Sequence, residues 1–289
     1  MSRRPLALAI LSLHLRAAGG AAALGVMVDK RPFHLHVPAS YDGSRAVPLV
    51  VLLHGIGVTS TLQEAYFRLK AESEARGFIY AYPDGTRGPA GAFWNGAGCC
   101  QVSISLPVDD VGYLDSIIGY VRNHYRLDEN RIFLTGHSNG SFMGTRYVCE
   151  RSQVAAIANL SGGQYTDRLR CGIPAGGRTA VLHMHGTADE ITPYFFSHIP
   201  VLPSALETVV NWTVRNGCFP FPLPAGTVDL VSDLAGNETG KVRFACIGAP
   251  LDFWTIAGGS HVPNMYQLGE AGRTLGANVM DWLYAHGRR

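Results

Sequence analysis

Short apolar runs alternate with amphipathic segments along the chain. The runs 48–53 and 78–82 are continuously apolar, as in strands that helices cover on both faces. Between such runs, apolar residues recur at helical spacing, for example Val111, Leu114 and Ile118 within 109–125. The alternation predicts an α/β fold with a mostly parallel central sheet and helices on both faces. Strands are expected at 33–37, 48–53, 78–82, 131–134, 155–160, 179–185, 227–231, 242–246 and 252–256, and helices at 62–76, 109–125, 203–216 and 268–286.

Composition and charge narrow the class of protein. The 289 residues are 47% hydrophobic and 16% charged, which suits a globular chain that buries a large core. The formal net charge is +2 and no run of Lys or Arg occurs, so nucleic-acid binding has no support. No repeat, low-complexity segment or linker interrupts the pattern, and we expect one domain over 24–289.

The first 23 residues follow a different pattern. Arg3 and Arg4 precede the apolar run 6–13, and small residues follow at 17–23. This order of basic, apolar and small residues is typical of a secretory signal peptide, so the sequence predicts 1–23 to be a signal and the protein to be exported. The apolar run is too short to span a membrane, and no other segment of the sequence is a better candidate. The alternative is a frayed apolar tail.

Cysteine usage agrees with export. An even number of cysteines without a C-x-x-C pair indicates disulfides in an exported chain, not a zinc or thioredoxin-like site. We expect Cys218 to pair with Cys246, because they flank a predicted helix end and a predicted strand. The other four cysteines allow three pairings, which the sequence leaves open, and six buried free thiols are the alternative. The six are Cys99, Cys100, Cys149, Cys171, Cys218 and Cys246.

The segment Thr135-Gly136-His137-Ser138-Asn139-Gly140-Ser141 carries the most specific local signal. It reads G-x-S-x-G, and it stands between a β-prone run at 131–134 and a helical pattern at 142–148. A serine on such a strand-to-helix turn is the nucleophile elbow of α/β-hydrolases. The turn is tight and needs small flanking residues, which Gly136 and Gly140 supply. Ser138 is therefore the predicted nucleophile, and an ordinary glycine-rich turn is the alternative.

A serine nucleophile needs a base, and the base needs an acid that orients it. The expected chain order is serine, acid, histidine. Asp189 is the best acid because it follows a buried strand, and His261 is the best base because it lies in a glycine-rich loop between the last strand and the last helix. His183 and His185 precede the acid and so are out of order. The other candidates for the acid are Asp167, Asp233 and Asp252, and the other candidate for the base is His286, which lies near the end of the sequence.

The oxyanion of a tetrahedral intermediate needs two preorganised N–H donors. One is expected at Asn139, directly after the nucleophile. The other is expected at Ile56, with Gly57 as the alternative, because Gly55 and Gly57 let the backbone approach the substrate closely. A plain strand-ending turn is the competing interpretation of this segment.

Seven motifs in one order are more specific than any one of them. They are Leu53-His54-Gly55, Tyr82-Pro83-Asp84-Gly85-Thr86, Trp94-Asn95 with Cys99-Cys100, Val108-Asp109-Asp110-Val111-Gly112-Tyr113, Gly136-His137-Ser138-Asn139-Gly140, His185-Gly186-Thr187-Ala188-Asp189 and Gly259-Ser260-His261. Over about 33–286 the chain resembles secreted esterases of the polyhydroxybutyrate depolymerase and feruloyl esterase type. The resemblance implies an α/β-hydrolase fold, a Ser138–Asp189–His261 triad, and Trp94 and Asn95 beside the acyl site. We also expect His137 to bind substrate.

Three positions depart from the pattern of that family. Ile56-Gly57-Val58 replaces a run that is often more polar or richer in glycine, and Ser141 replaces a frequent glycine. Val262-Pro263-Asn264 stands where a tryptophan-containing form is expected, which alters the expected pocket wall.

Together these features predict a secreted serine carboxylic-ester hydrolase that acts through an acyl-enzyme. The expected substrates are hydroxycinnamoyl (feruloyl) esters or 3-hydroxybutyrate polyester and its oligomers, and we favour small or soluble esters because no polymer-gripping module is recognised. An acetyl-polysaccharide esterase, a peptidase and a catalytically silent binding module are the alternatives. No cofactor or metal is expected, because the pairs His34-x-His36 and His183-x-His185 lack a third ligand beside them. The oligomeric state stays open.

Overall fold

The computed structural model describes residues 24–28, 31–89, 91–96, 99–100, 108–164, 171–172, 177–197, 202–265 and 274–288. The predicted signal peptide at 1–23 lies outside these ranges and stays a prediction. None of the helices in these ranges is long and apolar enough to cross a membrane.

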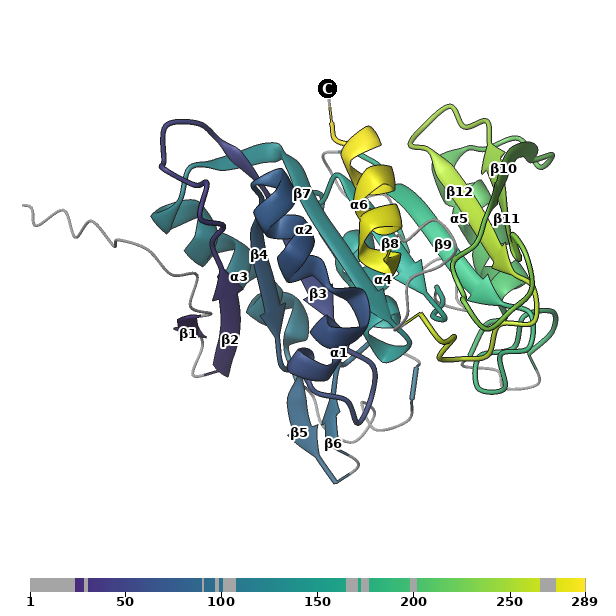
Figure 1. Cartoon of the computed structure of the whole chain (residues 1–289), viewed down its shortest axis with the longest axis horizontal. Helices are drawn as coiled ribbons and strands as arrows, with labels where there is room; N and C mark the ends of the chain where they lie inside the picture. Colours follow the sequence, from purple (N-terminus) through teal and green to yellow (C-terminus); the bar gives the residue numbers. More distant parts are fainter. Residues whose placement is uncertain are drawn as a thin grey trace, which may run out of the picture.

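A ten-stranded sheet organises the fold (Figure 1). Its strands are β1 (Leu24–Val28), β2 (Arg31–His36), β3 (Val47–Leu53), β4 (Ile79–Pro83), β7 (Leu127–His137), β8 (Ala156–Leu160), β9 (Ala180–Gly186), β10 (Leu223–Val228), β11 (Thr239–Phe244) and β12 (Leu251–Ile256). Their spatial order is β1-β2-β4-β3-β7-β8-β9-β12-β11-β10. The strands from β4 to β12 in that order pair in parallel, and both edges are antiparallel.

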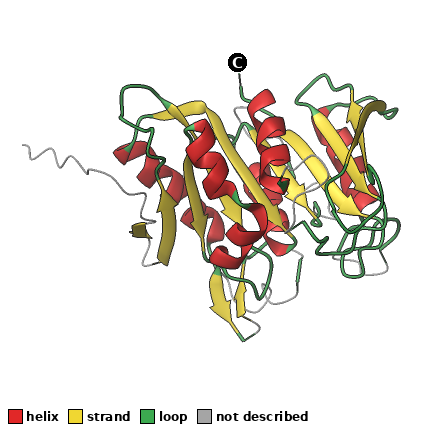
Figure 2. Ribbon diagram, viewed as in Figure 1, coloured by secondary structure: helices red, strands yellow, loops and turns green. Residues whose placement is uncertain are grey.

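Helices cover both faces of this sheet (Figure 2), which confirms the predicted α/β class. They are α1 (Ser60–Phe67), α2 (Leu69–Arg76), α3 (Asp110–His124), α4 (Asn139–Glu150), α5 (Ala205–Asn216) and α6 (Leu275–Ala285). Helices α1, α2 and α6 lie on one face, and α3, α4 and α5 lie on the other.

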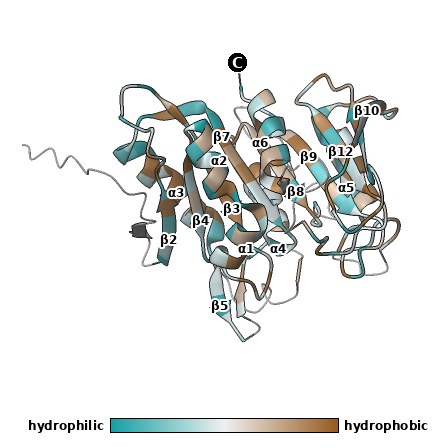
Figure 3. Ribbon diagram, viewed as in Figure 1, coloured by the Kyte–Doolittle hydropathy of each residue, from teal (hydrophilic) through white to brown (hydrophobic). Residues whose placement is uncertain are grey.

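The central strand β3 shows why its run is continuously apolar. Successive side chains of a strand point to opposite faces. Val50 and Leu52 therefore join the core under α1, α2 and α6, whereas Leu49, Val51 and Leu53 join the core under α3 and α4. In Figure 3 the part of β3 that is visible behind the helices is brown, the colour of hydrophobic residues. Burial on both faces demands apolar residues at every position.

The helix predicted at 62–76 is two helices, and this expectation was wrong. Arg68 separates α1 from α2 with a left-handed φ of 57°. The carboxylate of Glu64 accepts hydrogen bonds from the N–H groups of Leu69 and Lys70 at 3.2 and 2.9 Å. It thus replaces the bonds that a continuous helix would have made, and Tyr80 on β4 donates to the same carboxylate. A buried side chain from the first helix caps the second.

Three strands were not predicted. The edge strand β1 pairs with β2 directly after the expected signal. The hairpin of β5 (Thr86–Gly88) and β6 (Gly91–Phe93) lies in a segment expected to be a loop.

The helix expected at 268–286 is described from Leu275 onward, and 266–273 lie outside the described residues. All the other expected strands and helices overlap observed ones.

Three disulfides join the six cysteines. The predicted pair Cys218–Cys246 is confirmed. The pairing that the sequence left open is Cys99–Cys100 and Cys149–Cys171.

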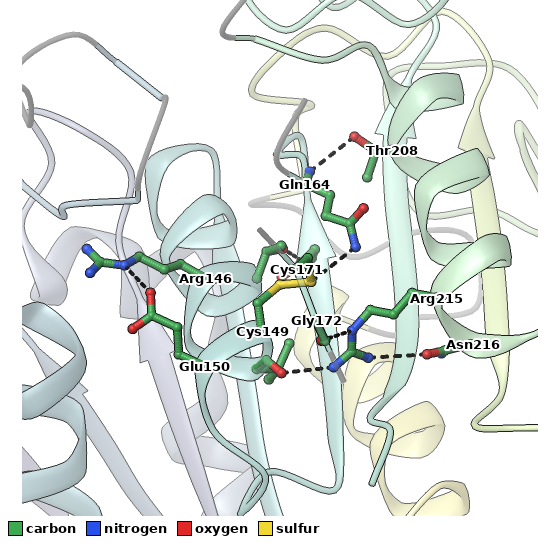
Figure 4. Close-up of a disulfide and its surroundings, with 12 residues drawn as sticks. Arg146, Cys149, Glu150, Gln164, Cys171, Gly172, Thr208, Arg215 and Asn216 are labelled. Atoms are coloured by element: carbon green, nitrogen blue, oxygen red, sulfur yellow. Dashed lines mark hydrogen bonds and ion pairs between the residues drawn. A yellow bond between two sulfur atoms is a disulfide. The ribbon is translucent and has the colours of Figure 1, made fainter. Parts of the chain in front are cut away.

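The Cys149–Cys171 disulfide fastens the end of α4 to the chain beyond β8 (Figure 4). Beside it, the buried guanidinium of Arg215 on α5 donates to the carbonyls of Val148 and Gly172 at 3.0 and 3.2 Å. Burial lowers the pKa of Arg215 to about 10. The helix α4, which begins directly after Ser138, is therefore anchored at its far end by a covalent bond and by α5.

Candidate active site

Ser138 occupies the turn between β7 and α4 in a backbone conformation that few residues adopt. Its φ is 53° and its ψ is −121°, and its N–H donates to the Leu160 carbonyl at 2.9 Å. Such strained positions persist only where the surrounding structure holds them, and they cluster at functional sites. A Cβ placed on Gly140 would lie 2.2 Å from the Leu53 oxygen, so this turn has no room for a side chain. The tight packing presents Ser138 at the carboxyl edge of the parallel strands.

The structure brings Ser138, His261 and Asp189 together. Ser138 Oγ lies 2.9 Å from Nε2 of His261. The other ring nitrogen of His261, Nδ1, lies 3.0 Å from each carboxylate oxygen of Asp189. Asp189 follows β9 and His261 follows β12, and these strands are parallel neighbours, so their loops meet at one edge. Each of the three residues is at most 8% exposed, so water screens these contacts little.

Asp189 has donors on both carboxylate oxygens. The N–H groups of Ile191 and Thr192 donate to Oδ1 at 2.9 and 2.7 Å. Nε2 of His185 lies 3.1 Å from Oδ2. Burial raises the pKa of Asp189, but hydrogen bonds from His185 and His261 outweigh it and hold the pKa well below its usual range. A charged Asp189 fixes the His261 proton on Nδ1, which leaves Nε2 free to accept from Ser138.

His137, the residue before Ser138, contacts the backbone of His261. Its Nε2 donates to the His261 carbonyl at 2.8 Å, and the residue is 5% exposed. Burial, with repulsion from His261, lowers the pKa of His137 to about 4, so the ring is neutral at neutral pH. A buried, neutral ring bonded to the loop of His261 is placed to position that loop, and little of its surface is open to a substrate.

The turn at 55–58, directly after β3, offers four N–H groups. Gly57 donates to the Ala92 carbonyl at 2.8 Å, and the N–H groups of positions 55 and 58 are also engaged within the protein. Among the residues that the structure describes, none accepts from the Ile56 N–H. Because the Gly57 N–H is engaged, the described contacts leave the Ile56 N–H as the better candidate for the second oxyanion donor that the sequence predicts, the first being expected at Asn139.

Trp94 and Asn139 connect the segment after β6 to the turn that carries Ser138. The Asn139 side chain accepts from the Trp94 N–H at 2.6 Å and donates to the Trp94 carbonyl at 3.0 Å. The Trp94 indole N–H donates to the His54 carbonyl at 3.1 Å. Trp94 and Asn139 are both 0% exposed, so the indole supports the turn that carries Ile56 and offers no surface to a substrate. The sequence held no local signal for this use of the Asn139 side chain.

Asn95 and a disulfide complete this support. The Asn95 N–H donates to a carboxylate oxygen of Asp110 at 2.6 Å, and its side chain donates to the Val108 carbonyl. The Asn139 amide nitrogen also lies 3.7 and 3.6 Å from the sulfurs of Cys99 and Cys100. The contacts of Asn95 tie it to Val108 and to the start of α3.

The other candidate acids lie elsewhere. Asp252 forms a two-bond ion pair with Arg243 at 2.9 and 2.8 Å. Asp233 accepts from Asn264 at 3.3 Å, and Asp167 lies outside the described residues. No group of three or more His, Cys, Asp or Glu side chains within the described ranges is arranged to hold a metal ion.

Known proteins resemble this chain in sequence and in fold, although no family model matches it. Feruloyl esterase B of Piromyces equi is 24% identical over 245 residues, which are 80% of this chain and 42% of that protein. Poly(3-hydroxyalkanoate) depolymerase C of Paucimonas lemoignei is 25% identical over 282 residues, 89% of this chain and 64% of the relative. The chain spans less than two thirds of the length of the first curated relatives that it matches.

A solved structure supports the same fold. The acetyl xylan esterase from Aspergillus awamori superposes with a TM-score of 0.67 at 17% identity, covering 92% of this chain and 99% of that one. The chain therefore has the α/β-hydrolase fold, and the resemblance to esterases of the feruloyl esterase and poly(3-hydroxyalkanoate) depolymerase type is confirmed.

Proposed function

We propose that the protein is a serine carboxylic-ester hydrolase that acts through an acyl-enzyme. The observation that carries the proposal is the chain of contacts from Ser138 Oγ through His261 to Asp189, at 2.9 and 3.0 Å. It has the order and atoms of a serine hydrolase triad. The esterase relatives support an ester as the substrate.

In the first half of the reaction, Ser138 Oγ attacks the ester carbonyl while Nε2 of His261 takes the hydroxyl proton. The charge that develops on the carbonyl oxygen is stabilised by the N–H groups of Ile56 and Asn139. The intermediate then collapses, the bond between the carbonyl carbon and the alcohol oxygen breaks, and His261 protonates the leaving alcohol. The acid remains bonded to Ser138.

In the second half, water attacks the acyl-enzyme. His261 takes a proton from the water, and the same two N–H groups stabilise the second oxyanion. When this intermediate collapses, His261 returns its proton to Ser138 Oγ and the free acid leaves. Asp189 stays ionised throughout and stabilises the imidazolium, which is consistent with the lowered pKa of its carboxyl group.

Exposed apolar side chains that follow Asp189 and His261 in the chain support an ester with an apolar part. Ile191 and Val262 follow Asp189 and His261 closely in the chain and are 56% and 49% exposed. Phe195 and Phe196 lie a few residues further on, and are 55% and 77% exposed. The relatives are named for feruloyl esters and poly(3-hydroxyalkanoates). We therefore propose feruloyl esters or 3-hydroxybutyrate oligomers as substrates, with acetylated polysaccharide as the second candidate, because an acetylxylan esterase is also a relative.

We further propose that the protein is exported. Its disulfides are of the kind that form and persist in oxidising environments. Expression with 1–23 present, followed by N-terminal sequencing of the mature protein, tests this proposal, and an uncleaved intracellular product would contradict it.

The first experiment compares the wild type with Ser138→Ala on methyl ferulate and on a soluble 3-hydroxybutyrate oligomer. Removing the nucleophile should lower kcat by several orders of magnitude, about 10⁴–10⁶-fold as in other serine hydrolases. Ser44→Ala, on an exposed loop, is the matched control and should keep full activity. If Ser138→Ala matches the wild type, the proposed mechanism is wrong; if neither protein cleaves any ester but both bind one, the binding-module alternative replaces it.

A further inference from the structure

A second imidazole lies on the carboxylate of Asp189. Nε2 of His185, on β9, is 3.1 Å from Asp189 Oδ2, and both side chains are 0% exposed. The same oxygen lies 3.0 Å from Nδ1 of His261. One carboxylate oxygen is therefore shared between the histidine of the proposed triad and a histidine that the mechanism does not use.

The neighbours of His185 fix where its proton lies. Its Nε2 faces two acceptors, the Asp189 carboxylate and the Thr192 carbonyl at 2.8 Å, so Nε2 must carry a hydrogen. Its Nδ1 lies 3.3 Å from Nε2 of His183, also on β9. Burial lowers the pKa of His183 well below its usual range, so that ring is neutral. Donation from His183 Nε2 to His185 Nδ1 pairs these two nitrogens without adding a charge. The other nitrogen of His183, Nδ1, is buried and has no hydrogen-bond partner among the described residues.

Aromatic rings hold these two imidazoles in place. His183 stacks on Phe253 of β12 with ring centroids 5.7 Å apart. Tyr194 lies edge-on to His185 at 6.2 Å, and its hydroxyl contacts Thr255. The line from His183 through His185 to Asp189 is therefore buried and fixed on both sides.

We infer that His185, held by His183, is a positioning residue that sets the basicity of His261 by sharing the Asp189 carboxylate. The inference rests on the proposed function. A hydrogen bond donated to Asp189 Oδ2 draws off part of the negative charge that would otherwise stabilise the His261 imidazolium. With His185 in place, the base gives up its proton to the leaving alcohol more readily.

The described groups that contact His261, besides Asp189, are Glu190, His137 and Ser138. Its N–H donates to the Glu190 carboxylate at 3.1 Å, from the same loop as Asp189. His137 at the end of β7 contacts its carbonyl, and Ser138 at the start of α4 contacts its ring. His137 is neutral near neutral pH because its pKa is lowered to about 4. Glu190 contacts the backbone N–H of His261. Asp189 itself also accepts from the backbone N–H groups of Ile191 and Thr192 at Oδ1. His185 is thus the described side chain, besides His261, that donates to the Asp189 carboxylate.

Two substitutions at one position separate this effect from packing. His185→Gln keeps an amide donor that reaches Asp189, and His185→Phe keeps a planar ring of similar width but donates nothing. Loss of the donor should move the midpoint of the His261 titration upward by about one pH unit, because one hydrogen bond to a charged group is lost. In His185→Gln the midpoint should stay near the wild-type value.

The midpoint is measured in two ways. NMR titration of the His261 ring in a Ser138→Ala background needs no activity, so it separates this inference from the proposed function. The acid limb of kcat/KM in the enzymes with Ser138 intact should move in the same direction, with about a tenfold loss of kcat/KM on that limb. If His185→Phe is folded and its midpoint is unchanged or lower, the inference is overturned. A Ser138→Ala protein that still cleaves esters contradicts the proposed function instead.

A third variant covers the case in which His185→Phe does not fold. His185→Asn keeps a polar group for His183, but its shorter side chain withdraws the donor from Asp189. It should show the same upward shift as His185→Phe, whereas an Asn variant that titrates like the Gln variant overturns the inference.

Discussion

The two halves of the proposed triad are held in different ways. Ser138 is fixed by its own backbone, in a turn so tight that a Cβ on Gly136 would lie 2.8 Å from the Gly140 carbonyl carbon. Asp189 and His261 are fixed by hydrogen bonds from several separate segments of the chain. The half with Ser138 is local and rigid, and the half with His261 is assembled from distant parts. Damage to the first should therefore be all-or-none, whereas damage to the second should come in steps.

Asp189→Asn alters the residue at the centre of the half that is assembled from distant parts of the chain. We expect this substitution to have the largest effect on activity. The neutral amide cannot stabilise the His261 imidazolium and offers a donor where an acceptor is needed. By analogy with other triads, kcat should fall by about 10⁴-fold. Asp233→Asn, which alters an acid bonded only to Asn264 among the described contacts, is the control and should leave kcat unchanged. Equal kcat values in both variants would contradict the role proposed for Asp189.

Gly140→Ala tests the rigid half. The added Cβ would meet the Leu53 carbonyl oxygen at 2.2 Å, and backbone cannot move aside without disturbing β3. We expect a loss of more than about 4 kcal/mol in the free energy of unfolding, measured by urea denaturation. Gly144→Ala on the same helix is the matched control, because its Cβ would lie 3.6 Å from the nearest atom, Asn159 Oδ1. The control should change stability by at most about 1 kcal/mol.

The sequence predicted the rigid half well because all its determinants lie within a few residues. The G-x-S-x-G pattern, the apolar strand before it and the helical pattern after it indicated where Ser138 lies, and the structure places Ser138 on that turn. The central sheet was predictable for a similar reason, since burial on both faces leaves a continuous apolar run. The catalytic roles themselves remain predictions.

The sequence could not show the contacts that depend on distant segments. Chain order set His185 aside, although the turn after β9 folds Asp189 back onto it. The break at Arg68 depends on the Glu64 carboxylate and on Tyr80 from another strand, so the helical pattern alone predicted one helix. Trp94 fits the motif of the family, but only the fold shows that its indole is buried against His54.

His137 stands next to Ser138 and is hydrogen-bonded to the His261 carbonyl, so it joins the two halves. His137→Phe tests this contact through the pH dependence of stability. In the folded protein the pKa of His137 is about 4, against about 6.5 when unfolded. Between these values the unfolded chain binds one more proton, so stability is complete above about pH 6.5 and falls as the pH falls toward 4. The full loss from this residue is about 3 kcal/mol.

The measurement is the free energy of unfolding from urea denaturation at several pH values between 4 and 7. The Phe variant should show a slope smaller by about one proton over this range, while His183 keeps contributing in both proteins. Unchanged slopes would mean that His137 is not buried in the neutral form. Asp189, whose pKa is lowered, adds its own loss of stability only at more acidic pH.

Glu190→Ala tests whether the His261 half fails in steps, and we expect the smallest effect here. The Glu190 carboxylate accepts the His261 N–H at 3.1 Å, which is one of several bonds on this loop. The His261 carbonyl remains bonded to His137, and the ring remains bonded to Asp189. Losing one bond at an exposed acceptor should lower kcat/KM by about 2–10-fold, the equivalent of about 0.5–1.5 kcal/mol.

Glu190→Gln separates the bond from the charge, because its amide oxygen can still accept the same N–H. We expect it to lie within about twofold of the wild type in kcat/KM. If Glu190→Ala instead abolishes activity while remaining folded, the loop of the base is as intolerant as the turn at Ser138. That result would contradict the contrast drawn between a rigid turn at Ser138 and a His261 loop held by separate contacts. A loop supported by independent hydrogen bonds must survive the loss of one of them.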